Sequence, residues 1–485
     1  MAGVLDGLKP VKVFSFFEEI SRIPRGSGNE KGISDYLVSF AKERNLEVIQ
    51  DEANNIIIKK NGSKGYENSA TVIIQGHLDM VCEKNRATVH DFEKDPIELV
   101  VDGDFIKAKG TTLGGDDGIA VAYAMALLDS DDIAHPPIEV VLTTDEESGM
   151  SGVMNLKPDH INGRRLLNID SEEEGQLLVS CAGGMRTNVA LPIEWTESSI
   201  KGTHLHLRIE GLKGGHSGSD IKLERANANV TLGRLLYDIA KSVEFELSAI
   251  NGGAKNNAIP RESEAFIIVK HEDVDKIKAK VEEWESILKN EYRNSDKDIR
   301  VELDVIDAKE EKVFSKETKD KAIKLLNVIP NGIYTMSTDI AGLVQSSTNI
   351  GVLTTKENEI DYDSAVRSSV RTLKYDILNQ TIIIAEALGA KVKVTSEYPE
   401  WKYNANSELR EILKKVYKRM YDAEPEVVAI HAGVECGFLE EKFGAIDMIS
   451  FGPNIYDAHT PDERLSISST ERTWNYLLEV LKELK

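Results

Sequence analysis

Two histidines and three acidic residues stand where the chain is predicted to leave a strand or to begin a helix. They are His77, Asp116, Glu147, Asp170 and His459. Imidazole nitrogens and carboxylate oxygens in this proportion suit zinc or a similar divalent ion. One carboxylate can bridge two ions about 3.5–4 Å apart, and Asp116, in a glycine-rich turn before a helix, is the candidate bridge. Two divalent cations would balance three carboxylates and a bridging hydroxide, so these residue types predict a two-metal site.

Two further acidic residues could support the chemistry of such a site. Asp79 follows His77 by two residues, so in an extended strand it lies on the same face and can orient the imidazole. Glu146 and Glu147 are adjacent and point to different sides, so one can bind metal while the other acts as general base toward water. Any one of these residues alone is more often a solvated or structural side chain. Their combination indicates a site, because several separate strand ends would otherwise carry ligands by chance.

Four apolar segments lead into these residues and are predicted to be strands. The segments are 71–75 before His77, 140–144 before Glu147, 166–169 before Asp170 and 448–451 before His459. In open α/β sheets, ligands bind beyond the carboxyl ends of the strands. The pattern therefore predicts an α/β domain with a mostly parallel central sheet and a polar crevice at one edge. The glycines of segment 110–118 are expected to let the backbone and a metal ion approach closely.

The middle of the chain differs from its two ends in its pattern of apolar and polar residues. Residues 187–395 contain amphipathic strands and helices, without apolar strands that end in histidine and carboxylate ligands. His459 must return to the N-terminal sheet to meet His77. We therefore expect a discontinuous metal-binding domain of residues 1–186 and 396–485, with residues 187–395 inserted as a separate domain.

The bulk composition excludes several classes of protein. The 485 residues include 59 Lys and Arg against 82 Asp and Glu, a net charge of −23, which disfavours binding to nucleic acid or anionic membranes. No window approaches the ~20 apolar residues of a membrane-spanning helix, and no signal peptide is expected. Three widely spaced cysteines argue against a disulfide scaffold and fit a reducing cytosol. We expect a cytoplasmic protein without nucleic-acid or membrane partners.

Five motifs, in order along nearly the whole chain, resemble one known family. They are His77-Leu78-Asp79, residues 113–118, residues 144–149, residues 168–172 and residues 458–461. They resemble the dinuclear-zinc exopeptidases related to carboxypeptidase G and aminoacylase and, more closely, the bacterial aminoacyl-histidine dipeptidases (carnosinase-like Xaa-His dipeptidases). The resemblance implies a zinc-exopeptidase catalytic domain with an inserted α+β lid domain. It implies that the five ligands named above bind metal, with Asp116 bridging, Asp79 orienting and Glu146 as general base.

The resemblance carries one further implication and one departure, both in the glycine-rich loop. It implies a cis peptide bond between Asp116 and Asp117. Asp117 itself departs from the family pattern, in which asparagine is commoner. An additional carboxyl group there would bring negative charge beside the metals and could alter metal preference.

The resemblance also assigns residues of the inserted domain to the substrate. His216 is implied to stabilise the oxyanion of the tetrahedral intermediate, and in many relatives it comes from the partner subunit of a dimer. Asn257 and Arg367 are implied to hold the substrate's C-terminal carboxylate, a task that suits a guanidinium fork. Gly433 is implied to line the pocket, in a loop where Glu435 could meet a substrate amine. Taken alone, Asn257 or Arg367 would more often be a surface polar residue.

These expectations combine into one predicted function. We expect metal-dependent hydrolysis of dipeptides, including Xaa-His dipeptides, by water activated by two metal ions, with Glu146 as general base. Zinc fits best, with manganese or cobalt as alternatives, and a homodimer through the lid domain is expected. One alternative is a deacylase or desuccinylase of N-acyl amino acids on the same scaffold. Another is a non-catalytic metal-binding scaffold protein, against which the intact Glu146 argues.

Overall fold

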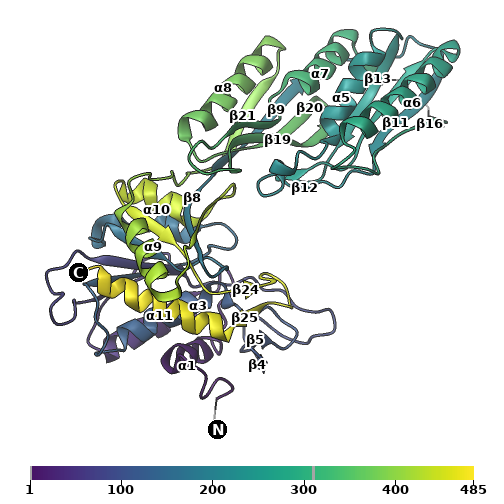
Figure 1. Ribbon diagram of the computed structural model, residues 1–485. Coiled ribbons are helices and arrows are strands. Elements are labelled where there is room, and N and C mark those ends of the chain that lie inside the picture. Colours follow the sequence, from purple (N-terminus) through teal and green to yellow (C-terminus); the bar gives the residue numbers. More distant parts are fainter. Residues whose placement is uncertain (1–2, 309–311) are drawn as a thin grey trace. The chain divides into compact units, whose positions relative to one another are not determined.

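The computed structural model of the chain describes residues 3–308 and 312–485. They form two compact units, which we call the first and the second unit. The first comprises the residues up to Ser180 together with Tyr403–Ala429 and Val434–Lys485, and the second comprises Cys181–Lys402 and Ile430–Gly433. The purple N-terminal and yellow C-terminal segments therefore share the first unit (Figure 1).

An eight-stranded sheet forms the centre of the first unit. Its spatial order is β1 (Glu47–Gln50), β2 (Ile56–Lys60), β6 (Ile138–Thr143), β3 (Val72–His77), β7 (Arg165–Asn168), β23 (Asp447–Ser450), β8 (Gln176–Cys181) and β22 (Glu426–Ile430). The four strands predicted to lead into ligands are β6, β3, β7 and β23, and they are consecutive neighbours that pair in parallel. β1–β2, β2–β6 and β23–β8 pair antiparallel. The prediction of a mostly parallel sheet is thus correct for its centre, and the sheet as a whole is mixed.

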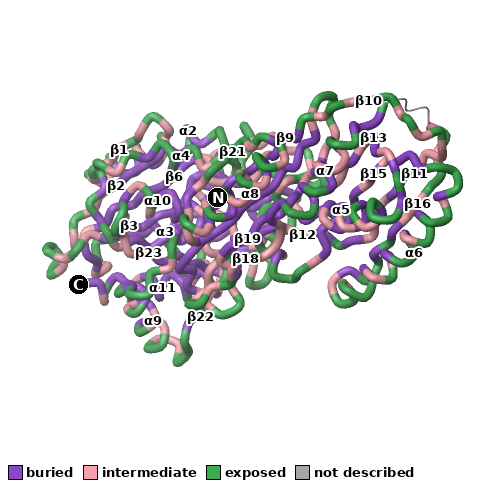
Figure 2. The backbone as a smooth tube through the Cα atoms, turned by 90° about the horizontal axis from the view of Figure 1, so that it is seen from above, coloured by how far each residue is buried: buried purple, intermediate pink, exposed green. Residues whose placement is uncertain are grey.

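Helices and a small second sheet complete the first unit. The helices are α1 (Val11–Ile20), α2 (Lys31–Glu43), α3 (Gly115–Leu128), α4 (Ser151–Asn155), η1 (Pro158–His160), α9 (Glu408–Tyr421), α10 (Glu435–Phe443) and α11 (Ile467–Glu483). The small sheet has the order β24 (Ile455–Tyr456), β25 (Arg464–Ser466), β5 (Phe105–Ala108) and β4 (Leu99–Asp102). α3 packs against α1 and β3. Residues 118–128 are apolar on every side of the helix, and all of residues 117–128 are buried (purple in Figure 2).

The second unit is built on a nine-stranded sheet. Its order is β16 (Arg300–Ile306), β11 (Thr203–Glu210), β15 (Ser263–Val269), β13 (Phe245–Gly252), β19 (Val344–Thr355), β20 (Glu359–Ser368), β9 (Gly183–Pro192) and β21 (Lys391–Tyr398), with β18 (Gly332–Met336) also paired to β19. Along β11, Leu205, Leu207 and Ile209 are buried and join the apolar core under the helices. His204, His206 and Arg208 alternate with them on the more exposed face, as the alternation in the sequence predicted.

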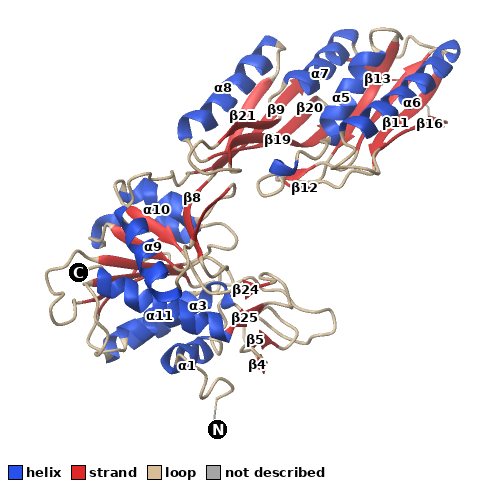
Figure 3. Cartoon of the chain, in the orientation of Figure 1, coloured by secondary structure: helices blue, strands red, loops and turns tan. Residues whose placement is uncertain are grey.

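Four long helices accompany this sheet (blue in Figure 3). They are α5 (Ala228–Ile239), α6 (Val274–Glu291), α7 (Lys316–Val328) and α8 (Arg371–Ala387). The remaining short elements are β10 (Trp195–Glu197) paired with β17 (Lys312–Phe314), β12 (Gly215–His216) paired with β14 (Ala258–Ile259), η2 (Ile221–Leu223) and η3 (His271–Asp273). Among the described residues, no helix is both long and apolar enough to cross a membrane.

The division between the units differs from the boundaries expected at residues 187 and 395. β9 pairs with β20 from Gly183 onward and with β21 as far as Tyr398. Residues 183–186 and 396–398 therefore belong to the second unit, because their ladder hydrogen bonds lie there. Residues 430–433 join it too, since the Ala182 N–H approaches the carbonyl oxygens of Ile430 and Ala432 at 3.2 and 3.1 Å.

Candidate metal centre

The structure brings the five predicted ligands together in the first unit. His77 is the last residue of β3, and Asp116 is the second residue of α3. Glu147 and Asp170 follow β6 and β7, and His459 lies between β24 and β25. They form two groups that could each hold a metal ion, His77–Asp116–Asp170 and Asp116–Glu147–His459. Within each group the ligand atoms all lie within 4.8 Å of one another. Asp116 is common to both groups, as expected for the bridging ligand that its glycine-rich turn in the sequence suggested.

The distances place Asp116 between the two imidazoles. Its Oδ1 lies 3.1 Å from His77 Nε2 and its Oδ2 lies 3.1 Å from His459 Nε2. His77 Nε2 also lies 3.5 Å from Asp170 Oδ1, and His459 Nε2 lies 3.0 Å from Glu147 Oε1. The Nε2 atom of each imidazole therefore faces two carboxylates at once.

These residues fit a pair of divalent ions. A ring nitrogen can donate at most one hydrogen, so it cannot satisfy two carboxylates. Accordingly, Glu147 Oε1 is buried and has no hydrogen-bond partner among the described residues. A cation among the nitrogen and both oxygens would satisfy all three as ligands, and this mixture of nitrogen and oxygen donors suits zinc and similar metals.

The charges of the ligands perturb one another strongly. The close contacts of His459 with the carboxylates of Asp116 and Glu147 raise the pKa of His459 to about 11. Burial raises the pKa of Glu147 and of Asp170. Burial acts in the same sense on Asp116, but the hydrogen bonds from His459 and His77 hold its pKa below the usual range. Such a cluster of acids and imidazoles retains protons that divalent cations would replace.

Asp79 connects His77 to the loop after β6. Its Oδ1 lies 3.4 Å from His77 Nδ1 and also accepts a hydrogen bond from the Glu146 N–H at 3.0 Å. Its Oδ2 accepts from the Glu147 N–H at 3.2 Å and from Ser27 Oγ at 2.8 Å. Burial opposes ionisation of this carboxyl group, but contact with His77 and these hydrogen bonds hold the pKa of Asp79 at about 2. Asp79 thus stays ionised and can fix both the imidazole and the Glu146–Glu147 backbone.

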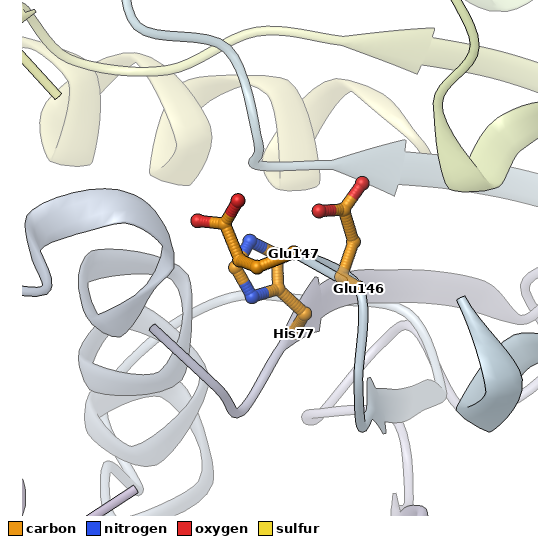
Figure 4. A group of neighbouring side chains, drawn as sticks. All are labelled: His77, Glu146 and Glu147. Carbon is orange, nitrogen blue, oxygen red and sulfur yellow. The ribbon is translucent and has the colours of Figure 1, made fainter. Parts of the chain in front are cut away.

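Glu146 lies beside the ligands. It forms a third group of potential ligands with His77 and Glu147, and the two carboxyl groups diverge from their neighbouring backbone positions (Figure 4). Burial raises the pKa of Glu146 to about 9, and the charges of Asp170 and Glu435 act in the same direction, against His77. A carboxylate with raised proton affinity beside a metal centre is suited to general base catalysis.

The metal-free protein is expected to lose stability as the pH rises from 4.5 to about 9. The pKa of Glu146 is raised from 4.5 to about 9 and that of buried Glu435 from 4.5 to about 8. The folded state then binds more protons than the unfolded state across this range, so the free energy of unfolding falls with pH. The raised pKa of His459 has the same sign above its ordinary value of 6.5. Thermal melts in EDTA at several pH values measure the decline.

Two further melting experiments, one with added zinc and one with a substituted protein, test the cause of that decline. Excess zinc should remove or reverse it, because divalent cations favour the ionised carboxylates. Glu146→Gln should make it shallower, because one of the titrating groups is gone. A melting temperature of the metal-free protein that rises with pH over this range would contradict the assignment.

Asp117 follows Asp116 across a cis peptide bond, as the resemblance implied. Its carboxyl group is buried, and its Oδ2 accepts a hydrogen bond from the backbone N–H of His77 at 3.2 Å. Burial raises the pKa of Asp117 well above the usual range, and the charges of Asp170 and Asp116 act in the same direction. The side chain therefore contacts the backbone of β3 at the point where Gly76 leaves room for it, since a Cβ at Gly76 would lie 2.3 Å from Asp117 Oδ2.

Asp117→Asn is expected to leave metal content unchanged and kcat/KM within about threefold of the wild-type value. The amide oxygen of asparagine can accept the same hydrogen bond from the backbone N–H of His77. The Asp117 carboxyl group that asparagine replaces already favours its neutral form. Metal analysis and steady-state kinetics measure both quantities. Loss of one metal equivalent would mean instead that the charge of Asp117 contributes to the site.

The second unit brings several of the predicted substrate residues together. Arg367 Nη2 lies 3.4 Å from His216 Nε2, and Arg367 Nη1 donates to the Tyr398 hydroxyl at 2.9 Å. Arg367 Nε is buried without a hydrogen-bond partner among the described residues. Gly433 packs against the same tyrosine, because a Cβ there would lie 2.6 Å from the Tyr398 ring. Burial lowers the pKa of His216, and the charge of Arg367 lowers it further.

Asn257 lies next to His216. The strand pairing matches His216 with Ala258, and the carbonyl oxygen of Asn257 accepts a hydrogen bond from the Ser217 N–H at 2.8 Å. Both Asn257 and His216 line a cleft of about 870 Å³ within the second unit. The sequence interpretation therefore grouped residues that the fold does place near one another, although their roles remain predictions.

The sequence interpretation assigned no role to two residues of this polar group, although it placed His431 in the loop expected to line the substrate pocket. Tyr398 binds Arg367, and His431 Nε2 lies 2.7 Å from Ser347 Oγ. Burial lowers the pKa of His431 to about 3, and the charge of Arg367 contributes. The only signal in the sequence was the position of His431 in the loop that leads to Gly433. For Tyr398 there was none, because a tyrosine near the end of a polar strand is common.

Glu435 lies deeper in the first unit than its position in a loop suggested. It is the first residue of α10 and is fully buried. Its Oε2 accepts hydrogen bonds from Gln75 Nε2 at 2.7 Å and from Thr143 Oγ1 at 2.6 Å. Burial raises the pKa of Glu435 to about 8. Its carboxyl group therefore lies against the ends of β3 and β6, the strands that lead to His77 and to Glu146.

Similarity to known proteins agrees with this arrangement. Cytosol non-specific dipeptidase of Escherichia coli (strain K12) is 38% identical over 482 residues, which cover 99% of each chain. The crystal structure of aminoacylhistidine dipeptidase from Vibrio alginolyticus is 37% identical and matches with a TM-score of 0.95, over 99% of this chain and 98% of that chain. An aminopeptidase from Bacillus cereus, 14% identical, shares the fold with a TM-score of 0.56 over 98% of this chain and 99% of that chain.

The family assignment rests on a match over most of the chain. The sequence profile of peptidase family M20/M25/M40 matches residues 73–483, a span that includes every residue of both candidate metal groups. The resemblance noted in the sequence motifs is therefore confirmed at the level of the family. The chain belongs to peptidase family M20/M25/M40.

Proposed function

We propose that this protein hydrolyses dipeptides, including Xaa-His dipeptides, with two divalent metal ions. The observation that carries the proposal is Asp116, whose two oxygens are each 3.1 Å from a different imidazole, with Glu146 in an overlapping group of ligands. The names of the Escherichia coli and Vibrio alginolyticus relatives support peptide substrates of this length.

The metals are proposed to be held by two sets of residues. His77 and Asp170 would hold one ion and Glu147 and His459 the other, with Asp116 shared between them. Bound divalent ions supply Lewis acidity and lower the pKa of water. Zinc suits the nitrogen and oxygen donors best, and manganese or cobalt could replace it.

Three residues of the chain would carry out proton transfer, orientation of a ligand and stabilisation of the oxyanion. Glu146 would accept the proton of the attacking water and then pass it to the leaving amine, a transfer that restores its carboxylate. Asp79 would hold His77 in orientation through the contact at Nδ1. His216 would donate a hydrogen bond to the developing oxyanion.

The second unit is proposed to supply the substrate's recognition. Arg367 has a buried Nε without a hydrogen-bond partner among the described residues, which leaves part of its fork for a carboxylate. Asn257 and the backbone of Gly433 would complete the binding of the C-terminal residue. A guanidinium group that binds a free carboxylate would favour substrates with an unblocked C-terminus.

The proposal extends to the state of the protein in the cell. We propose a homodimer formed through the second unit, a cytoplasmic location, and no nucleic-acid or membrane partner. The net charge of −23 supports the last of these. Light scattering coupled to gel filtration tests the dimer. If the second unit forms the interface between the two copies, substitutions of its exposed residues that break this interface should yield monomers.

A panel of substrates tests the function. Metal-free protein is loaded with zinc, manganese or cobalt and assayed with dipeptides of varied sequence, tripeptides, and N-acetyl and N-succinyl amino acids. Dipeptide hydrolysis, with little or none of the N-acyl substrates, is expected. Turnover confined to the N-acyl compounds would favour a deacylase on the same scaffold, and no turnover with any metal would favour a non-catalytic protein.

A further inference from the structure

Arg25 connects two loops of the metal centre although it is no ligand. It lies in the turn between α1 and α2, and its side chain is buried. Its Nη1 donates to the carbonyl oxygens of Leu78 and Asp79, both at 3.0 Å. Its Nη2 donates to the carbonyl oxygen of Gly114 at 2.5 Å. One guanidinium group thus holds the loop after β3, which carries Asp79, against the loop before α3.

Glu463 holds the same glycine-rich loop through its N–H groups. Its Oε2 accepts from Leu113 N at 2.7 Å and from Gly114 N at 3.1 Å. Its Oε1 accepts from Gly115 N at 2.7 Å and from Asp116 N at 3.4 Å. Glu463 is buried and lies four residues after His459, in the same connection between β24 and β25.

The glycines of this loop make room for Arg25. A Cβ at Gly114 or at Gly118 would lie 2.5 Å from Arg25 Nη2. Gly114 also has a φ of 69°, in the left-handed region that glycine adopts most readily. The sequence suggested that these glycines allow a metal ion to approach. At these two positions, the structure shows that they admit a buried guanidinium group.

We propose that Arg25 and Glu463 are positioning residues for Asp116. They bind the carbonyl and the N–H groups of the same four-residue segment, and so fix where the Asp116 carboxylate can point. Because that carboxylate must face His77 and His459 together, a small rotation of the loop would lose one contact or the other. The inference rests on the proposed metal pair and adds two residues outside the ligand set on which the pair depends.

Cobalt binding tests the proposal without substrate. Metal-free wild-type protein, Arg25→Lys and Glu463→Gln are titrated with cobalt(II) against a competing chelator, while the visible absorption reports the geometry around each ion. Lysine donates from a single nitrogen, so it cannot reproduce the two separate contacts that Nη1 and Nη2 of Arg25 make with the two loops. Glutamine presents an N–H₂ group to backbone donors. Each variant is expected to bind cobalt about 10–100-fold more weakly, with an altered absorption spectrum.

Two matched variants separate positioning from a general loss of stability. Arg410 is also buried and donates to two loop carbonyl oxygens, those of Asn404 and Ala405. Glu139 is also buried and accepts from two backbone N–H groups, those of Asn162 and Gly163. Arg410→Lys and Glu139→Gln are expected to lower the melting temperature while cobalt affinity and spectrum stay at their wild-type values.

The outcomes are distinct. Wild-type cobalt affinity and spectrum in Arg25→Lys and Glu463→Gln would overturn the proposal, as would equal losses in the two control variants. If one test variant does not fold, the other decides, because both act on one segment. In the double variant the losses should be less than additive for the same reason. Wild-type protein that binds no cobalt would refute the metal pair itself, and the positioning role with it.

Discussion

Glu146→Gln is expected to lower kcat by about 10²–10⁴-fold while the protein keeps its full complement of metal. Glutamine has nearly the shape of glutamate but cannot accept the proton of the attacking water. The backbone N–H of Glu146 donates to Asp79, so the loop should keep its conformation in the variant. Metal analysis of the purified variant and a full steady-state profile with a dipeptide substrate measure the two effects separately.

The adjacent residue supplies the matched comparison. Glu147→Gln alters the same loop by the same change, but Glu147 lies 3.0 Å from His459 Nε2 in the second metal group. That variant should lose metal together with activity, and the exposed Glu93→Gln should lose neither. Full activity in Glu146→Gln would remove this residue as the base, and loss of metal in it would make it a ligand instead.

His459→Ala is expected to release one of the two metal ions and to abolish most activity. His459 approaches both Asp116 and Glu147, so its loss leaves the second group with two carboxylates and no nitrogen donor. Removing one of three protein ligands should weaken that ion's binding more than the 10–100-fold typical of a residue that only supports a ligand. Metal content after dialysis, and kcat with metal added back, measure the effect.

His160→Ala is the control for that experiment, because His160 is an exposed histidine of the same unit in a short helix away from the ligands. It should retain both metals. Two metals retained in His459→Ala, with normal affinity, would exclude the second group as a metal site. Activity that high metal concentration restores fully would show that His459 serves binding alone.

The sequence alone determined the centre of the first unit. The segments that become β3, β6, β7 and β23 were recognisable because each is an apolar run that ends in a polar residue, a property of consecutive residues. Their adjacency in parallel followed from a general rule about where ligands lie in α/β sheets. The types of the ligands also followed from sequence, since the chemistry of an imidazole or a carboxylate does not depend on the fold.

The grouping of those ligands was decided only by the tertiary structure. Asp116 and His459 are 343 positions apart, yet their side chains are 3.1 Å apart. No local pattern states which carboxylate stands between two imidazoles. The position of His459 depends on β25 pairing with β5, a contact between distant segments. The antiparallel outer strands of the sheet and the limits of the second unit likewise depend on which strands pair.

Arg25, Glu463 and Tyr398 were also visible only in three dimensions. A charged residue in a turn, or a tyrosine at the end of a polar strand, is usually solvated, and the sequence offers no sign that such a side chain is buried. Burial of Arg25 and Glu463 is stable here because backbone groups satisfy both charges with hydrogen bonds. Both side chains bind the glycine-rich segment, and Arg25 also binds the carbonyl oxygens of Leu78 and Asp79. Those partners exist only after the loops have met, because backbone groups carry no information in the sequence about what will bind them.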